Sequence, residues 1–316
     1  MGADTSDHQP VLMSQALEGL GLSQTGCYID GTYGRGGHSA EILKRLGEHG
    51  SLLALDKDPT AVEHAKQHLD ADPRFCIRQG GFENLQEHIE PWLQGRILSG
   101  VLLDLGVSSP QLEDPERGFS FLRDGPLDMR MNPGSGVTAG EWLQQVSEGE
   151  LVSVLHRFGE EPRARRVAQA IIRARNNHPI KSTGRLANII AEISGARPHR
   201  IHPATRTFQA IRIHINDELE SLKHGLKACS SLLGKGDRLC VISFHSLEDR
   251  IVKRFMASQA KEDPVYAGLP DIPVEARPVM RLVGRLVRPT QSEVESNPRA
   301  RSAKLRVAEK LGVGVL

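Results

Sequence analysis

The chain has 316 residues, of which 39% are apolar, and its formal net charge is +1. This length predicts two domains, or one domain with a large insertion, and the apolar content is sufficient for a packed core. No run of about 18 apolar residues occurs and the first residues are polar, so we expect no membrane contact and no signal peptide. The four cysteines are far apart without a C-x-x-C pair, which predicts buried thiols in a reducing cytoplasm and no metal site.

The first part of the chain alternates predicted strands with predicted helices, as parallel α/β sheets do. Pro59 after Asp58 fits the first turn and the N-cap of one of these helices. In such a sheet, ligands bind at the carboxyl ends of the strands. The strands are expected at residues 27–30, 51–56, 75–78 and 100–105, and the helices at 39–46 and 60–69.

A glycine-rich turn, residues 31–37, joins the first strand to the first helix. Glycine lets a ligand approach the backbone amides without a Cβ in the way. About 20 residues later, Asp56 ends the second strand, where an acid accepts hydrogen bonds from ribose hydroxyls. The pattern predicts a pocket for a nucleoside cofactor. A glycine-rich turn without a ligand is disfavoured because strand, turn, helix and second acid all fall in place.

The glycine spacing distinguishes between cofactors. Dinucleotide sites follow G-x-G-x-x-G, whereas Gly34, Gly36 and then Ser39 leave the third glycine out. The missing glycine weakens the interpretation as a nicotinamide or flavin site. A dehydrogenase-like nucleotide-binding protein therefore stays as the second interpretation of this chain. Asp30 ahead of the glycines suits S-adenosylmethionine, which has no pyrophosphate but carries an ammonium and a sulfonium that acids can accept.

Two further residues lie at or just beyond the ends of strands at the same edge. Phe82 follows the third strand in Gly80-Gly81-Phe82 and fits either an adenine-stacking role or a core position. Asp104 follows three apolar residues of the fourth strand. Acids at such strand ends are more often exposed to a cleft than structural, which makes Asp104 a catalytic candidate.

The strand pattern stops at Ser108, and residues 108–140 form a long loop of the kind that is usually functional. Helical periodicity follows without strands. Residues 156–214 contain twelve Arg and Lys against three Glu, a local net charge of +9, and eleven of the twelve are Arg. Guanidinium groups form bidentate hydrogen bonds with phosphates, so this block predicts a surface that binds nucleic acid. A non-catalytic RNA-binding protein would explain the charge but not the cofactor loop.

The sheet pattern resumes with a strand at 238–244 and a helix at 247–256. We therefore expect one discontinuous domain, residues 1–115 and 213–316, with an all-helical basic domain, 116–212, inserted between the fourth and fifth strands. Ser243, His245 and Asp249 are too close in sequence to predict a hydrolytic triad. The proline-rich tail, 257–316, is expected to be irregular, and it carries a second basic cluster at Arg299, Arg301, Lys304 and Arg306.

Long motifs over nearly the whole chain resemble one family, the bacterial ribosomal RNA small subunit methyltransferases H, also called the MraW family. One departure is Gln15, where the family usually has Glu after its opening motif. The motifs that carry the resemblance are His8-Gln9-Pro10-Val11-Leu12, Asp30-Gly31-Thr32 through Gly36-Gly37-His38, residues 104–112, 117–121 and 124–131, 202–210, Ser243-Phe244-His245-Ser246-Leu247-Glu248-Asp249-Arg250, and residues 297–302.

The resemblance implies a Rossmann-like class I methyltransferase that uses S-adenosylmethionine. Its implied substrate is N4 of a cytidine in the decoding (P-site) region of 16S rRNA in the small ribosomal subunit. The oligomeric state is not fixed by the sequence, and a homodimer is compatible with it. The implied cofactor contacts are Gly36, Gly37, His38, Asp56, Phe82, Asp104 and Gln111.

Cytosine N4 is a weak nucleophile because its lone pair is delocalised into the ring, so the enzyme must turn the base out and hold the amine in line with the methyl group. Related amine-methylating enzymes often place an aromatic residue after the fourth strand. Here Asp104-Leu105-Gly106-Val107 has none, so Phe119 or Phe121 is a hypothesis for base stacking, and Asp104 could instead hold the cofactor. The substrate candidates are Phe119, Phe121, Asp128, Arg166, Arg206 and His245.

Overall fold

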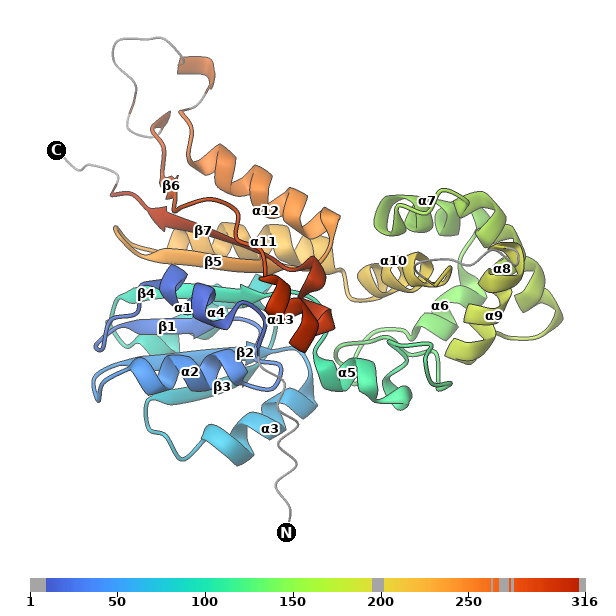
Figure 1. Cartoon of the computed structure of the whole chain (residues 1–316), viewed down its shortest axis with the longest axis horizontal. Helices are drawn as coiled ribbons and strands as arrows, with labels where there is room; N and C mark the ends of the chain where they lie inside the picture. The colour runs from blue at the N-terminus through green and yellow to red at the C-terminus, as the bar shows by residue number, and fades with distance from the viewer. Residues whose placement is uncertain (1–9, 195–201, 263, 267–272, 274–275, 313–316) are drawn as a thin grey trace. The chain divides into compact units, whose positions relative to one another are not determined.

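The computed structural model describes residues 10–194, 202–262, 264–266, 273 and 276–312. The chain divides into two compact units (Figure 1). The sheet unit consists of residues 1–106 and 219–316, and the helical unit consists of residues 107–218. The chain thus leaves the sheet unit once, builds the helical unit, and returns.

A seven-stranded sheet forms the centre of the sheet unit. The first five strands along the chain run parallel, whereas β7 is antiparallel to both of its neighbours. The order of the strands reverses between β1 and β4, which is the position where open α/β sheets bind ligands. The order is β3 (Phe75–Gln79), β2 (Ser51–Asp56), β1 (Cys27–Asp30), β4 (Leu98–Asp104), β5 (Arg238–Ser243), β7 (Lys304–Lys310) and β6 (Met280–Leu282).

Both faces of the sheet are covered, so its central strands are apolar almost throughout. In β1 all four residues are buried. One face packs against α1 (Met13–Leu20), α2 (Gly37–Arg45) and α3 (Pro59–Leu69). The other face packs against α4 (Leu85–Leu93), α11 (Glu218–Leu232) and α12 (Ser246–Gln259).

The Rossmann-like α/β sheet predicted from the sequence is confirmed, with strand and helix ends shifted by up to three residues. Asp58 caps α3 as expected, because its side chain accepts the Thr60 N–H at 2.9 Å and Pro59 occupies the first turn. Among the described residues, no helix has the length and apolar character to cross a membrane.

The prediction of an irregular tail was wrong. The tail contains β6, β7 and the short helix α13 (Gln291–Ser296), and β7 pairs with β5 along its length. Leu305 and Val307 are buried on one side of β7, while Lys304 and Arg306 on the other side each hold Asp249 of α12 at 2.8 Å. This period-two alternation is the signature of a strand, but the surrounding prolines and basic residues concealed it.

The helical unit has its own core. That core is built from one apolar stripe on each main helix, including Leu155, Ile171, Leu186 and Ile211. Its helices are α5 (Ser109–Glu113), α6 (Ala139–Gln145), α7 (Glu148–Gly159), α8 (Ala164–Asn177), α9 (Thr183–Ser194) and α10 (Thr205–Ile215).

Candidate cofactor site

Three acids lie at the carboxyl ends of three adjacent strands of the sheet unit. Asp30 ends β1, Asp56 ends β2 and Asp104 ends β4. The registers place Asp30 beside Ala54 and Leu102, both two residues before the neighbouring acid. The acids therefore share one edge, at the point where the strand order reverses.

The glycine-rich turn closes around Asp56. Gly34 and Gly36 have φ of 57° and 73°, values that side chains disfavour. The Gly34 N–H donates to Asp56 Oδ2 at 2.8 Å, and the Asp58 N–H donates to Oδ1 at 2.9 Å. Burial raises the pKa of Asp56 to about 6, although these two hydrogen bonds oppose the rise. The carboxylate is thus preorganised, and its negative charge is costly until a ligand provides further donors.

Position 37 needs a glycine because the Pro10 ring packs closely against its backbone, and not because of its own backbone angle. A Cβ at this position would lie 2.2 Å from Cγ of Pro10. The segment that begins at Pro10 is held in turn by Glu293 of α13, whose carboxylate accepts the Leu12 N–H at 2.6 Å. Residues near the two ends of the chain therefore meet beside the glycine-rich turn.

Replacing Gly37 with Ala should destabilise the protein by about 1–3 kcal/mol, the usual range for an overpacked site. The added methyl group must displace Pro10. Chemical denaturation measures the change. Gly149→Ala in α7 is the matched control, because a Cβ there meets nothing within 4 Å, and the better helix propensity of Ala should leave stability unchanged or increase it. Equal effects of the two substitutions would contradict the steric explanation.

Asp30 is a buried support for the turn. Its side chain is 1% exposed, and its two oxygens accept the Ser39 hydroxyl at 2.7 Å and the Thr32 N–H at 3.1 Å. Burial raises the pKa of Asp30, while Ser39, His38 and Thr32 act in the opposite direction. The serine that breaks the dinucleotide motif therefore has a structural role, as the partner of this acid.

His38 and Asp104 form a second buried pair. His38 Nε2 lies 3.4 Å from Asp104 Oδ2, and the backbone N–H of Asp104 donates to the Thr32 hydroxyl at 2.6 Å. Burial lowers the pKa of His38, but the carboxylates of Asp104 and Asp30 outweigh it, and the net shift is upward. In the described residues, both His38 ring nitrogens and Asp104 Oδ1 are buried without a hydrogen-bond partner. Buried polar atoms of this kind call for a partner, which an ordered water or a ligand provides.

Phe82 follows β3 in a short 3-10 turn, residues 82–84. A Cβ at Gly225 of α11 would lie 2.3 Å from its ring, and a Cβ at Gly31 would lie 3.1 Å from its Cβ. Phe82 is thus wedged between two glycines and only partly buried. Both a core role and adenine stacking fit this environment.

Sequence reasoning missed Glu83, the next residue. Lys57 Nζ contacts Glu83 Oε1 at 2.6 Å and Ser221 Oγ at 3.1 Å, while Glu83 Oε2 is buried without a hydrogen-bond partner in the described residues. The available signal was its position directly after Phe82, in a loop at the ligand-binding edge. We expect Glu83 to be a further acceptor for the cofactor.

His245 lies at the same edge of the sheet, just after β5. It is the N-cap of α12, where its Nδ1 accepts the Glu248 N–H at 3.4 Å and its Nε2 lies 3.1 Å from Glu248 Oε1. Glu248 in turn accepts the Phe244 N–H at 2.9 Å. Asp249 binds Lys304 and Arg306 instead of histidine, so the geometry agrees with the expectation that no hydrolytic triad forms.

The remaining predicted residues lie in the helical unit. Gln111 is buried, and its Oε1 accepts the Ser108 N–H at 2.9 Å in a capping box at the start of α5. Asp128 forms a two-pronged ion pair with Arg130, both contacts being 2.7 Å. Burial raises the pKa of Asp128, but Arg130 outweighs it and the net shift is downward. The cofactor role of Gln111 and the substrate role of Asp128 stay predictions.

The two phenylalanines proposed for stacking have different environments. Phe119 is buried in the helical core, with the Arg117 guanidinium 5.7 Å from its ring centre. Phe121 is only partly buried, and its ring lies 4.5 Å from that of His202 and 4.9 Å from that of Phe208. Phe121 is therefore the better placed of the two to meet another ring.

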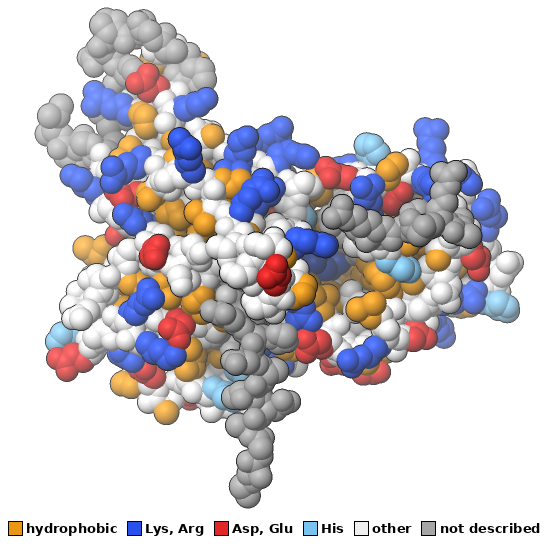
Figure 2. Space-filling model, viewed as in Figure 1, with side chains coloured by type: hydrophobic (Ala, Val, Ile, Leu, Met, Phe, Trp, Pro, Cys, Tyr) orange, Lys and Arg blue, Asp and Glu red, His pale blue; other side chains and the backbone are white. Residues whose placement is uncertain are grey.

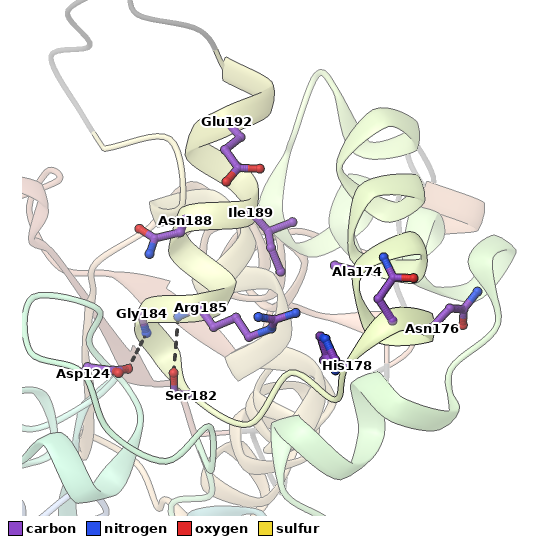
Figure 3. Close-up of a pocket in the computed structure, with 11 residues that line it drawn as sticks. Asp124, Ala174, Asn176, His178, Ser182, Gly184, Arg185, Asn188, Ile189 and Glu192 are labelled. Atoms are coloured by element: carbon purple, nitrogen blue, oxygen red, sulfur yellow. Dashed lines mark hydrogen bonds between the residues drawn. The ribbon is translucent and has the colours of Figure 1, made fainter.

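A polar hollow in the helical unit lies between the end of α8 and the start of α9 (Figure 3). Asp124 at its rim accepts the Gly184 N–H at 2.7 Å, which lowers the pKa of this carboxyl group. Arg185 extends from α9 over the hollow. None of the predicted cofactor residues lines it, and Asp124, one of its two acids beside Glu192, is already hydrogen-bonded, so we assign the chemistry to the edge of the sheet.

The edge of the sheet fits S-adenosylmethionine. Asp56 suits the ribose hydroxyls, the glycine-rich turn offers close backbone approach, and the unpartnered oxygen of Asp104 suits a cationic ligand. The fold and this site define a class I methyltransferase, the class of α/β enzymes that take the methyl group from S-adenosylmethionine.

The chain belongs to the MraW methylase family, whose model matches residues 5–311. Three relatives carry the name ribosomal RNA small subunit methyltransferase H. The Xylella fastidiosa protein is 52% identical over 97% of this chain and 98% of its own length. Those of Thioalkalivibrio sulfidiphilus and Coxiella burnetii are 51% and 50% identical over 98% and 96% of this chain and 99% of their own lengths. A solved putative rRNA methylase from Clostridium thermocellum covers 96% of this chain and 98% of its own at 12% identity and a TM-score of 0.46, and the family assignment does not depend on it.

Proposed function

We propose that the protein transfers the methyl group of S-adenosylmethionine to N4 of a cytidine in the decoding (P-site) region of 16S rRNA, within the small ribosomal subunit. The observation that carries the proposal is the presence, in one chain, of the acid-lined glycine turn and an arginine-rich helical unit. The names of the relatives, which act on small-subunit ribosomal RNA, support the substrate class. A ribosomal substrate also favours a cytoplasmic location.

We assign the helical unit to substrate binding because of how its arginines are displayed. On α8, Val167, Ala168 and Ile171 face the core. The exposed residues of this helix include Arg165, Arg166 and Arg173, and no acid lies on α8. Exposed guanidinium groups without acidic neighbours are suited to phosphate contacts. Arg206 on α10 is exposed as well, although it also donates to the Glu160 carbonyl at 3.2 Å.

The roles of the edge residues follow from their partners. When bound, S-adenosylmethionine supplies an electrophilic methyl group. Asp56 and the glycine-rich turn hold the ribose side, while Asp104 directs Oδ2 toward His38 and leaves Oδ1 free to accept a hydrogen bond. A free carboxylate oxygen beside the acceptor amine could orient its N–H, and this is why Asp104 is our catalytic candidate. His245 at the end of the next strand is a candidate for contact with the base.

Transfer of labelled methyl groups to small ribosomal subunits that lack this modification, followed by nucleoside analysis, tests the proposal. We expect the label in N4-methylcytidine within the decoding region. Label in another nucleoside, or label absent while S-adenosylmethionine still raises the melting temperature, would make the substrate assignment wrong and leave the methyltransferase class intact.

The stacking hypothesis is best tested at Phe121. We expect Phe121→Ala to slow methylation by about 10-fold or more, in line with the 1–3 kcal/mol attributed to one stacked base, with little change in cofactor affinity. Phe119→Ala removes a buried ring and should cost about 3–5 kcal/mol of stability, so its activity alone is not informative. The measurement is the methylation rate under single-turnover conditions. An unchanged rate in Phe121→Ala would exclude Phe121 as the ring that stacks on the substrate base.

A further inference from the structure

The outward face of α12 in the sheet unit carries basic residues without an exposed acid among them, and the turn that follows adds Lys261 beside the exposed Glu262. We call Arg250, Lys253, Arg254 and Lys261 the α12 face. Leu247, Val252 and Met256, on the other side of the helix, are buried in the core. All four basic residues are exposed. Figure 2 shows Lys and Arg side chains gathered over this part of the sheet unit.

The acids of α12 do not compensate the charges of Lys253, Arg254 and Lys261. Glu248 is buried, and its carboxylate accepts the Phe244 N–H at the start of the helix. Asp249 is already bound by Lys304 and Arg306. The nearest exposed acid along the chain is Glu262, which directly follows Lys261 and lies beyond the end of the helix. Within the described part of the chain, Lys253, Arg254 and Lys261 have no ion-pair partner.

Other surface helices of the same unit are built differently. On α2, Lys44 pairs with Glu41 three residues earlier, and on α11 Lys223 pairs with Glu220 in the same way. Such mixed-sign pairs are ordinary for a solvated helix. The neighbouring helices carry charges of both signs, whereas the α12 face carries positive charge. Such a face attracts a polyanion, in addition to keeping the protein in solution.

The position of α12 connects this charge to the site. The helix starts directly after β5, whose end lies beside the end of β4 and Asp104. Its 14 residues then extend about 21 Å away from that edge. A strand whose nucleotide enters the site can therefore place neighbouring phosphates along the helix.

We propose that the α12 face binds the phosphate backbone of the RNA substrate, as a second contact surface located on the sheet unit itself. This inference rests on the proposed function, since it takes 16S rRNA as the ligand. The contact would be insensitive to sequence, because cations on a backbone position the RNA but do not read its bases.

Salt dependence of RNA binding tests the α12 face. The variant Lys253→Gln/Arg254→Gln/Lys261→Gln removes three charges. The control Lys44→Gln/Arg45→Gln/Lys66→Gln removes three exposed charges from α2 and α3. The probe is a decoding-region transcript of 16S rRNA, with binding measured by filter retention at several salt concentrations. We expect the first variant to reduce the slope of log affinity against log salt by about two to three units, since each neutralised phosphate contributes about 0.7–0.9 to that slope, and the control to change it little.

Two further measurements separate the outcomes. Lys253→Arg/Lys261→Arg keeps the charge and should keep the wild-type slope, and the melting temperature with S-adenosylmethionine reports folding of each variant. If the wild-type protein methylates RNA while the two triple variants have equal salt slopes, the proposed role of the α12 face is wrong and the proposed function is unaffected. Wild-type protein that neither binds nor methylates the RNA at low salt would overturn the proposed function, and the inference would fall with it.

Discussion

Asp104→Asn should reduce methylation by about 10²–10³-fold or more. This carboxylate is the partner of buried His38 and has a second buried oxygen without a hydrogen bond. Removing one member of a buried charge pair costs about 2–5 kcal/mol, much of it for the charge that is left behind. The substitution also removes a negative charge from a site that we expect to receive a cationic ligand.

The measurement is kcat/KM for methylation together with cofactor affinity by calorimetry. Asp70→Asn, at the exposed end of α3, is the control and should have wild-type values. Asp104→Glu keeps the charge but lengthens the side chain, so it should recover cofactor affinity better than it recovers the rate. If Asp104→Asn kept the wild-type rate, both the cofactor and the catalytic assignments of this residue would be wrong.

Cofactor affinity should fall as the pH drops through about 6, because the pKa of Asp56 is about 6 in the free protein. Ribose hydroxyls donate to the ionised carboxylate, so protonation competes with binding. We expect the dissociation constant to be flat above about pH 7 and to rise by up to about 10-fold per pH unit well below 6. Asp56→Asn should bind about 10- to 100-fold more weakly at neutral pH, as expected for the loss of hydrogen bonds to a charged group.

The same pKa predicts an opposite trend for the stability of the free protein. A carboxyl whose pKa is raised by folding keeps its proton in the folded state between about pH 4 and 6, where the unfolded chain has already lost it. The Asp56 contribution therefore becomes unfavourable as the pH rises through this window, by at most about 3 kcal/mol. Calorimetry in buffers of different ionisation enthalpy should detect proton release on cofactor binding near pH 6. Binding without proton release, and with a flat pH profile, would show that Asp56 does not receive the ribose.

The positions of Asp56 and Asp104 could be predicted because each residue ends an apolar strand, and that of Phe82 because it follows the third strand after two glycines. Parallel strands end at a common edge, so sequence position translates directly into location. The contacts that tune these residues could not be predicted in the same way. Lys57 reaches Ser221, and Leu12 meets Glu293, across 164 and 281 residues of sequence. No local pattern contains such pairs.

The tail illustrates the opposite limitation. The sequence alternates in residues 304–307, but its basic residues also have the composition of a charge cluster. In the structure Lys304 and Arg306 are part of a strand, and their charges are held by Asp249 of the neighbouring helix. Propensity and composition described this segment poorly because its pairing partner, β5, determines its conformation.

The late position of β7 in the chain has a consequence for synthesis on the ribosome. The helical unit is translated whole before β5 exists, and its core draws only on its own residues, so it can fold early. Strand β4 must wait more than a hundred residues for β5, and β5 in turn stays an open edge until residues 304–310 emerge. Completion of the sheet therefore waits until residues 304–310 have been translated, and until then β5 keeps an unpaired edge of the kind that promotes aggregation.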